Sequence, residues 1–149
     1  MTNRNLIRDI KLQTNGVHLI KKDDLKTATF RWRLSNFSLL NYKCESDVFE
    51  LNGHLWYLRF YPAGEKDNGT HVTLYLIYSG PDKSCIAHFI LKLINQQNHN
   101  LSYTFDGGSD TFRKNNGWGK SEFFPAHKLN DDILFDDSIV IEAYIKLEQ

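Results

Sequence analysis

The feature that most limits how this chain can fold is a period of two in its apolar residues. In the segment 139–147 these residues occupy every second position: Ile139, Ile141, Ala143, Ile145 and Leu147. The segment 29–34 repeats the pattern, with Arg31 and Arg33 between its apolar residues. Successive side chains of a strand point to opposite faces, whereas a helix needs apolar residues three or four positions apart. Both segments are therefore predicted to be strands with one buried face.

Turn signals separate further strands along the chain. Asn52-Gly53 stands between the segments 48–51 and 54–61, and this dipeptide strongly favours a two-residue hairpin turn. More strands are expected at 71–78 and 86–94. The pattern indicates seven or eight strands and no long amphipathic helix. Antiparallel strands with one buried face pack sheet on sheet, so the sequence predicts an all-β fold, a β-sandwich.

The first 26 residues differ from the rest of the chain. Apolar residues between Leu6 and Leu12 are spaced for a short helix, which Asn15-Gly16 would end. We expect residues 1–26 to be a leader, either flexible or a short helix, and residues 27–149 to be the β-sandwich domain. A second interpretation makes the leader the end of a helix through which the protein forms oligomers.

The charge balance limits the partners. The 149 residues include 18 basic and 18 acidic ones, which gives a net charge of zero. A general basic field for DNA or RNA is therefore not expected, nor is attraction to an acidic membrane surface. The start of the chain has no apolar core typical of a signal peptide. We expect a cytoplasmic protein, with the nucleus as the alternative, in which Cys44 and Cys85 stay thiols, although their spacing leaves pairing open.

Motifs for chemistry are few. None of the six histidines has a partner at metal-ligand spacing, and there is no Cys-x-x-Cys. The doublets Asp131-Asp132 and Asp136-Asp137 lack the ligand spacing of a calcium loop. A nucleophile elbow and a phosphate-binding glycine loop are also absent from the sequence. We therefore expect no metal, no cofactor and no enzymatic activity.

A tryptophan between two glycines is the most unusual local feature. Glycine weakens a strand but also marks a place where another backbone comes close. In one interpretation, Trp118 folds back over the core as part of a loop. In the other, Trp118 forms the wall of a groove, and the backbone of Gly117 and Gly119 pairs with an incoming strand, which is β-augmentation.

Several runs of sequence, in order, resemble the MATH (meprin and TRAF homology) domain family. They are Phe30-Arg31-Trp32-Arg33-Leu34-Ser35-Asn36-Phe37-Ser38, Trp56-Tyr57-Leu58-Arg59-Phe60-Tyr61-Pro62-Ala63-Gly64, His71-Val72-Thr73-Leu74-Tyr75-Leu76, and Trp118-Gly119 followed by Phe123 and Leu134-Phe135-Asp136-Asp137-Ser138. The resemblance covers residues 27–147. It implies an eight-stranded antiparallel sandwich that binds short linear peptides in a shallow groove on one sheet. Members of the family include ubiquitin-ligase adaptors, a deubiquitinating protease and TRAF receptor adaptors.

The resemblance also implies a set of peptide-binding residues. By position, Arg59, Tyr75, Phe89 and Trp118 match residues of the family's groove, and we add their expected neighbours in the groove, Phe112, Gly117, Gly119 and Lys120. Phe89 shares its parity with Leu91 and Leu93, so core packing is an equal alternative for it. Three positions depart from the family pattern: Gly117 replaces an acidic residue, Lys120 replaces an aromatic one, and a tyrosine of the family's pocket falls near Asp110, with Phe112 two residues on. Lys120 would favour an acidic or phosphorylated residue in the peptide.

The resulting functional prediction is a peptide-recognition module that acts as a substrate or receptor adaptor linked to ubiquitin signalling. Its expected partners are short linear motifs in other proteins and the machinery of ubiquitin ligases or deubiquitinases. One alternative is a carbohydrate-binding sandwich in which Trp118 and Tyr75 form a stacking platform. Another is a structural domain that forms oligomers through the N-terminal segment.

Overall fold

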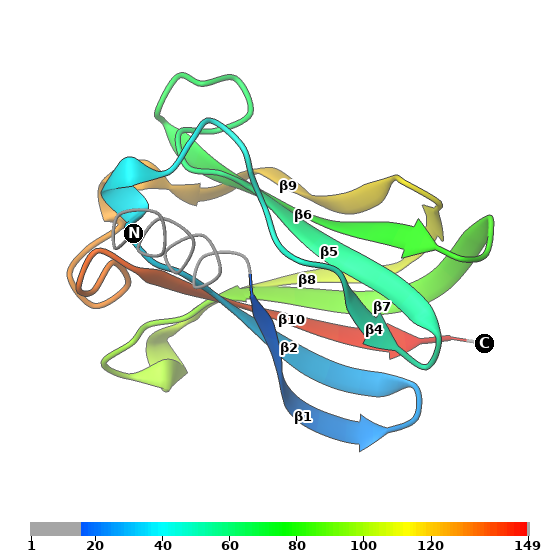
Figure 1. The fold of residues 1–149 in the computed structure, drawn as a ribbon. Coiled ribbons are helices and arrows are strands. Elements are labelled where there is room, and N and C mark those ends of the chain that lie inside the picture. Colours follow the sequence, from blue (N-terminus) through cyan, green and yellow to red (C-terminus); the bar gives the residue numbers. More distant parts are fainter. Residues whose placement is uncertain (1–15, 149) are drawn as a thin grey trace, which may run out of the picture.

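The computed structural model describes residues 16–148, which form two antiparallel sheets packed face to face (Figure 1). The first sheet has the order β1-β2-β10-β7-β8 and consists of β1 (Val17–Asp24), β2 (Thr27–Leu34), β10 (Ile139–Leu147), β7 (Ser84–Leu93) and β8 (Tyr103–Arg113). The second sheet has the order β3-β5-β6-β9 and consists of β3 (Cys44–Glu45), β5 (His54–Tyr61), β6 (His71–Gly80) and β9 (Gly117–Pro125), with β4 (Phe49–Leu51) also paired to β5.

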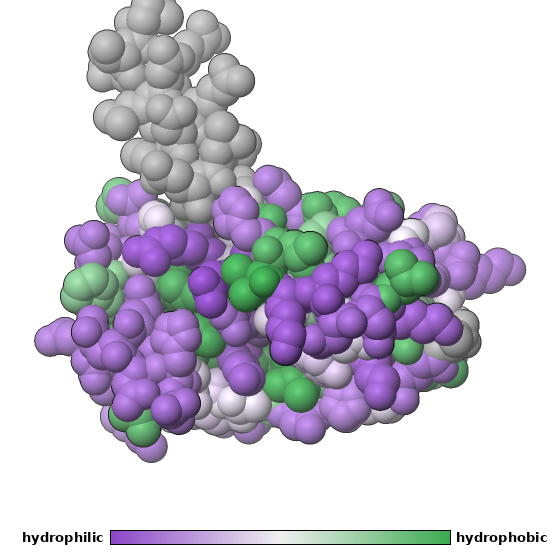
Figure 2. All heavy atoms as spheres, turned by 90° about the horizontal axis from the view of Figure 1, so that it is seen from below, coloured by the Kyte–Doolittle hydropathy of each residue, from purple (hydrophilic) through white to green (hydrophobic). Residues whose placement is uncertain are grey.

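The predicted all-β sandwich is confirmed, with two five-stranded sheets in place of the expected total of eight strands. Within the described range the helical segments are short 3-10 turns: η1 (Phe37–Leu39), η2 (His99–Leu101) and η3 (Ala126–Lys128). None of the helices in this range is long and apolar enough to cross a membrane. Figure 2 views the molecule from the side of β1 and β2, where hydrophilic side chains surround smaller apolar patches.

The core lies between the sheets and is built from the alternating residues. On β10, the residues from Ile139 to Ile145 with odd numbers are fully buried, while Lys146 is exposed. On β2, Trp32 is buried and Arg33 is exposed, as the period of two predicts. The Asn52-Gly53 turn is also confirmed, because both residues have a positive φ, 48° and 84°, as a two-residue hairpin loop requires.

The structure places part of the predicted leader inside the sandwich. Val17–Asp24 forms β1 and pairs with β2, so residues that the sequence assigned to the leader belong to the first sheet of the sandwich. This strand carries no period-two pattern because it lies at the edge of the sheet, where Leu19 and Ile20 are both largely exposed. The predicted short helix and its oligomerising role fall on residues 1–15, which lie outside the described residues.

The two cysteines are separate in the structure. Cys44 and Cys85 are both buried and both free thiols. Burial raises the pKa of the Cys85 thiol to about 11 and also raises the pKa of Cys44. Both side chains therefore stay protonated at neutral pH and pack as small apolar groups.

Candidate functional site

The second sheet turns one face outward, and two of the predicted residues meet there. Arg59 on β5 lies directly opposite Tyr75 on β6. Both side chains are half-buried on the outward face, whereas Leu58 and Leu74 next to them are fully buried in the core. The outward direction that the sequence predicts for Tyr75 is therefore confirmed.

A hollow of about 240 Å³ opens beside this pair, and we call it the outer hollow. It is lined by Arg59, Tyr75, Ile77, Asn115, Asn116 and Gly117. Three of these residues belong to the predicted site, and three do not. Ile77 is two positions after Tyr75 on β6 and therefore lies on the same face of the strand, so the alternation of the sequence could have identified it. Asn115 and Asn116 could not, because backbone hydrogen bonds between this turn and Tyr78 bring them to the hollow.

Arg59 is held in place by hydrogen bonds on the surface of the sheet. Its Nε donates to Glu45 Oε2 over 2.7 Å, and its Nη2 donates to the Tyr57 hydroxyl over 3.2 Å. Burial is the largest single influence and favours the neutral form, but the bond to Glu45 and the nearby charges of Glu45, Tyr57 and Tyr61 together outweigh it and raise the pKa of Arg59. A guanidinium has more N–H donors than these bonds use, so Arg59 can still donate to a ligand.

Tyr75 forms the floor of the same region. Its hydroxyl donates to Glu65 Oε1 over 2.6 Å, and its ring meets Tyr61 edge-on with the centroids 6.3 Å apart. Burial is the main cause that raises the pKa of Tyr75 well above its usual range, and the bond to Glu65 adds to it. Tyr75 therefore remains a neutral phenol that offers its ring to a ligand.

The glycines around Trp118 let β9 come unusually close to β6. A Cβ atom on Gly117 would lie 1.9 Å from the carbonyl oxygen of Leu76, and one on Gly119 would lie 2.1 Å from that of Leu74. Only glycine fits at either position. Side chains alternate between the two faces of a sheet, and Trp118 and Lys120 lie opposite Leu76 and Leu74, so they lie on the face that looks toward the first sheet.

Trp118 and Lys120 cross to the other sheet. The indole Nε1 of Trp118 donates to the carbonyl oxygen of Thr111 on β8 over 2.9 Å. The Lys120 ammonium lies 5.6 Å from the ring centroid of Phe105, also on β8. Both side chains therefore span the open side of the sandwich between β8 and β9, which we call the seam. Trp118 is 47% exposed and lies on a strand, so it is not a loop cover over the core.

Two predicted site residues are in the core. Phe89 and Phe112 are 1% and 0% exposed, and their rings pack edge-on with centroids 5.4 Å apart. Phe89 also lies directly beneath Gly107, where a Cβ atom would be 2.1 Å from its ring. Their positions face inward on β7 and β8, so neither side chain reaches the surface. The prediction that Phe89 and Phe112 contact a peptide is therefore wrong. For Phe89 the alternative, packing in the core, is correct.

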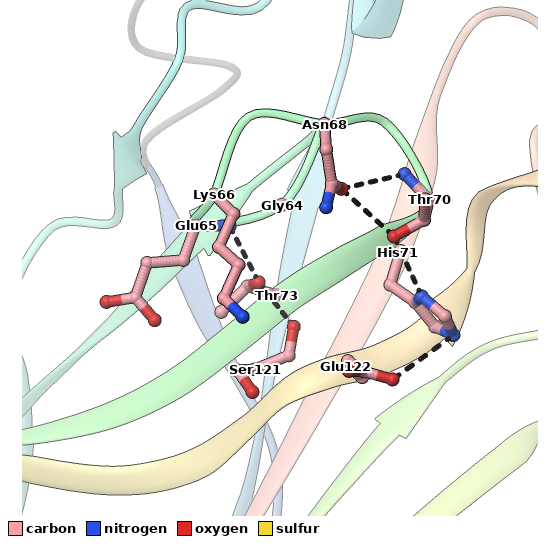
Figure 3. Close-up of a pocket in the computed structure, with 9 residues that line it drawn as sticks. All are labelled: Gly64, Glu65, Lys66, Asn68, Thr70, His71, Thr73, Ser121 and Glu122. Carbon is pink, nitrogen blue, oxygen red and sulfur yellow. Dashed lines mark hydrogen bonds and ion pairs between the residues drawn. The ribbon is translucent and has the colours of Figure 1, made fainter.

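A second hollow, of about 90 Å³, lies farther along the same pair of strands (Figure 3). Figure 3 shows the side chain of Lys66 reaching down from the loop above toward Thr73 of β6 and Ser121 of β9. His71 Nε2 lies 3.8 Å from Glu122 Oε2 at the side of this hollow. Thr73 and Ile77 are four positions apart on β6, roughly 13 Å, so hollows flank Tyr75 over the length of a short extended peptide.

The described residues hold no cluster suited to a metal ion. Within residues 16–148, no group of three or more His, Cys, Asp or Glu side chains is placed to hold a metal ion. What the surface does offer is a basic side chain, aromatic rings and an unpaired strand edge. These groups are suited to holding an extended peptide.

Comparison with known proteins gives a consistent result. Residues 29–145 match the family model of the MATH domain. The chain is 28% identical over 136 residues to ubiquitin C-terminal hydrolase 12 of Arabidopsis thaliana, an alignment covering 85% of this chain and 12% of that protein. It is 32% identical over 121 residues to a MATH domain and coiled-coil domain-containing protein of the same plant, covering 76% of this chain and 29% of that protein.

A third relative has a different domain partner. The BTB/POZ and MATH domain-containing protein 3 of Arabidopsis thaliana is 30% identical over 112 residues, covering 68% of this chain and 28% of that protein. The chain therefore spans between 12% and 29% of the length of these relatives. The similarity is to one domain that recurs beside different neighbours.

Proposed function

Since this chain belongs to the MATH domain family, whose domains mediate protein interactions, we propose that it binds short linear peptides of partner proteins along β9. The observation that carries the proposal is the outer hollow beside a free strand edge. In the described part of the chain, β9 ends the second sheet and pairs only with β6. Its other edge can accept an extended segment by β-augmentation.

The two sides of such a peptide would meet different surfaces. Alternate side chains of a strand point in opposite directions. One set would enter the outer hollow beside Arg59 and Tyr75, and the other would contact the exposed part of the Trp118 indole. This division supports a motif with requirements at alternate positions.

The expected affinity is moderate. Each backbone hydrogen bond contributes about 1 kcal/mol net, so the aromatic contacts must supply much of the rest. Ordering a flexible peptide offsets part of this gain, and we expect a Kd near micromolar, about −8 kcal/mol.

Lys120 gives the peptide a chemical preference. Within residues 16–148 its ammonium has an aromatic neighbour, Phe105, but forms no ion pair with a carboxylate. An acidic or phosphorylated residue of the peptide would supply a negative charge for the Lys120 ammonium and accept a charge-assisted hydrogen bond from it.

The link to ubiquitin is drawn from the relatives. One is named as a ubiquitin C-terminal hydrolase and another as a BTB/POZ and MATH domain-containing protein. We propose that this chain selects substrates or receptors for ubiquitin-related machinery in the cytoplasm or nucleus. A MATH domain is a protein-interaction domain and not a catalytic one, and the match to the hydrolase covers 12% of that protein.

The geometry does not favour the carbohydrate alternative. Tyr75 lies on the outward face of the second sheet, whereas Trp118 points to β8 across the seam. The two rings therefore do not form one flat platform for a sugar. The oligomer alternative depends on residues 1–15, which lie outside the described range.

An unbiased peptide-display selection against the full chain tests the proposal. Selected peptides should bind wild type and lose affinity for Trp118→Ala. A Leu101→Ala variant is the matched control, because Leu101 is 66% exposed and lies in η2, outside the strands that form the site. Equal loss in both variants would argue against the site.

A further inference from the structure

We propose that the outward face of the first sheet is a second docking surface, which takes an acidic segment of a partner protein that also carries an apolar side chain. This face lies on the opposite sheet from the peptide site, so the inference stands independently of the proposed function. It begins from a local excess of positive charge.

The outward positions of β2, β7 and β10 carry more cations than anions. The cations are Arg31, Arg33, Lys92 and Lys146, and the anion is Glu142. The flanking strands add Asp24 and Asp106, so the excess of positive charge is local to the middle of the face, around Arg31 and Arg33. A face of this kind attracts acidic segments.

One hollow on this face is suited to a carboxylate. It has a volume of about 180 Å³ and is lined by Arg31, Arg33, Ile94, Gln96, His99 and Val140. Ile94 and Val140 are only 4% and 6% exposed and form an apolar floor. An acidic group bound here would be partly shielded from water, which strengthens a charge-assisted hydrogen bond.

The two arginines of this hollow differ in their partners. Arg31 donates from Nε and Nη2 to Glu142 Oε2, over 2.9 Å and 2.6 Å. Arg33 is exposed and makes no ion pair with any residue in the described range. Arg33 is therefore the cation with its charge available to a ligand, and Arg31 is a neighbour that Glu142 holds in place and that lines the same hollow.

Another hollow on the first sheet, which we call the apolar hollow, offers a place for an apolar side chain. It has a volume of about 150 Å³, and Ile90 and Tyr144 form its apolar walls, with Thr29, Lys92 and Glu142 completing the lining. Val140 lines the hollow with the two arginines, and Tyr144 lines the apolar hollow. These two residues are four positions apart on β10, roughly 13 Å. An extended segment with an acidic and an apolar residue four positions apart would reach both hollows.

The charge of other candidate occupants is unsuitable. Residues 1–15 of this chain carry Arg4, Arg8 and Lys11 against Asp9, so this segment would be repelled by Arg33. A nucleic acid would bring a row of phosphates past Glu142, which stands between the two hollows. A protein segment with one acidic side chain at the right spacing avoids that repulsion.

Titration of the ¹⁵N-labelled full chain by NMR tests this surface. The probes are the capped peptides Glu-Ser-Gly-Ser-Leu and Leu-Ser-Gly-Ser-Glu, because the direction of binding is open. At least one should shift the amide signals of Arg33, Val140 and Tyr144 and leave those of Gly117–Lys120 unchanged. Replacing its glutamate by glutamine should weaken binding about tenfold, the value of one hydrogen bond to a charged group.

Variants of the protein complete the test. Arg33→Gln should weaken binding about tenfold. Lys146→Gln, which removes an exposed cation of the same face that lines neither hollow, should change it less than twofold. The proposal is overturned if neither peptide shifts these signals at millimolar concentration, or if the glutamine peptide binds as well. It is also overturned if Lys146→Gln weakens binding as much as Arg33→Gln, or if a short oligouridine binds this face more tightly than the peptide.

Discussion

The indole N–H of Trp118 on β9 donates to the carbonyl oxygen of Thr111 on β8 over 2.9 Å. Each of these strands ends its sheet, so the bond joins the two sheets at the seam. It also fixes the orientation of an indole that is half exposed. Trp118 therefore has a structural role, through its N–H, and a surface role, through its ring, and the two can be separated by substitution.

Trp118→Phe and Trp118→Ala should affect stability and peptide binding differently. The phenylalanine variant loses the bond to Thr111 but keeps an aromatic ring, so it should unfold about 1 kcal/mol more easily and keep most of its affinity. The alanine variant should lose about 2 kcal/mol of binding free energy, roughly thirtyfold in Kd. Urea denaturation and fluorescence anisotropy with a display-selected peptide measure the two effects. Equal affinity in the alanine variant and wild type would remove Trp118 from the site.

Gly119→Ala should destabilise the domain although its backbone conformation is ordinary. The added methyl group would lie 2.1 Å from the carbonyl oxygen of Leu74, so β9 must move away from β6. Overpacking of this kind costs about 3 kcal/mol. Gly108→Ala is the matched control, because its Cβ would meet open space and only the positive φ of 70° opposes it, at about 1 kcal/mol. The midpoint temperature of thermal unfolding should be lower for Gly119→Ala than for Gly108→Ala. The reverse order would contradict the close approach of β9 to β6.

Phe89 should behave as a core residue and not as a ligand contact. Phe89→Ala should cost about 3–5 kcal/mol of unfolding free energy because it leaves a cavity between the sheets. Phe89→Leu keeps most of the volume, so the variant should stay folded and bind the selected peptide with a Kd close to that of wild type. Differential scanning calorimetry measures the loss of stability in Phe89→Ala, and isothermal titration calorimetry measures the Kd of the peptide for Phe89→Leu. A folded Phe89→Leu variant with strongly weakened binding would return this residue to the site.

Ionisation of Tyr75 should lower the stability of the domain at alkaline pH. The pKa of Tyr75 is raised in the folded state, mainly by burial, so the folded protein keeps the phenolic proton that the unfolded chain loses. Its contribution to stability is complete below the unfolded pKa of about 10 and is lost progressively as the pH rises above it. Denaturant unfolding at rising pH should show a steeper loss for wild type than for Tyr75→Phe. Parallel curves for the two proteins would mean that this tyrosine titrates normally.

Much of the fold could be predicted from local sequence. The alternation in residues 139–147 and 29–34 is a direct consequence of a one-sided core, and both segments are strands with the expected faces. The first strand was not predictable by the same pattern. Val17–Asp24 lies at a sheet edge with most of its residues exposed, so neither face selects apolar residues.

The candidate site was predictable only in part. Parity alone places Tyr75 outward and gives Phe89 the core direction that the structure shows. The partner of Trp118 depends on β8 and β9 lying side by side across two sheets, and this follows from topology, not from any local pattern. The same topology separates the indole from Tyr75, which the family resemblance had grouped together.

The central claim is that a partner peptide binds along β9, between the outer hollow and the indole of Trp118. The most direct measurement is an NMR titration of the ¹⁵N-labelled chain with a display-selected peptide, repeated on Trp118→Ala and Leu101→Ala. Our account predicts signal shifts at Arg59, Tyr75 and the amides of Gly117–Lys120, a Kd about thirtyfold weaker for Trp118→Ala, and no change for Leu101→Ala. Shifts confined to other strands, or an unchanged Kd in Trp118→Ala, would contradict it.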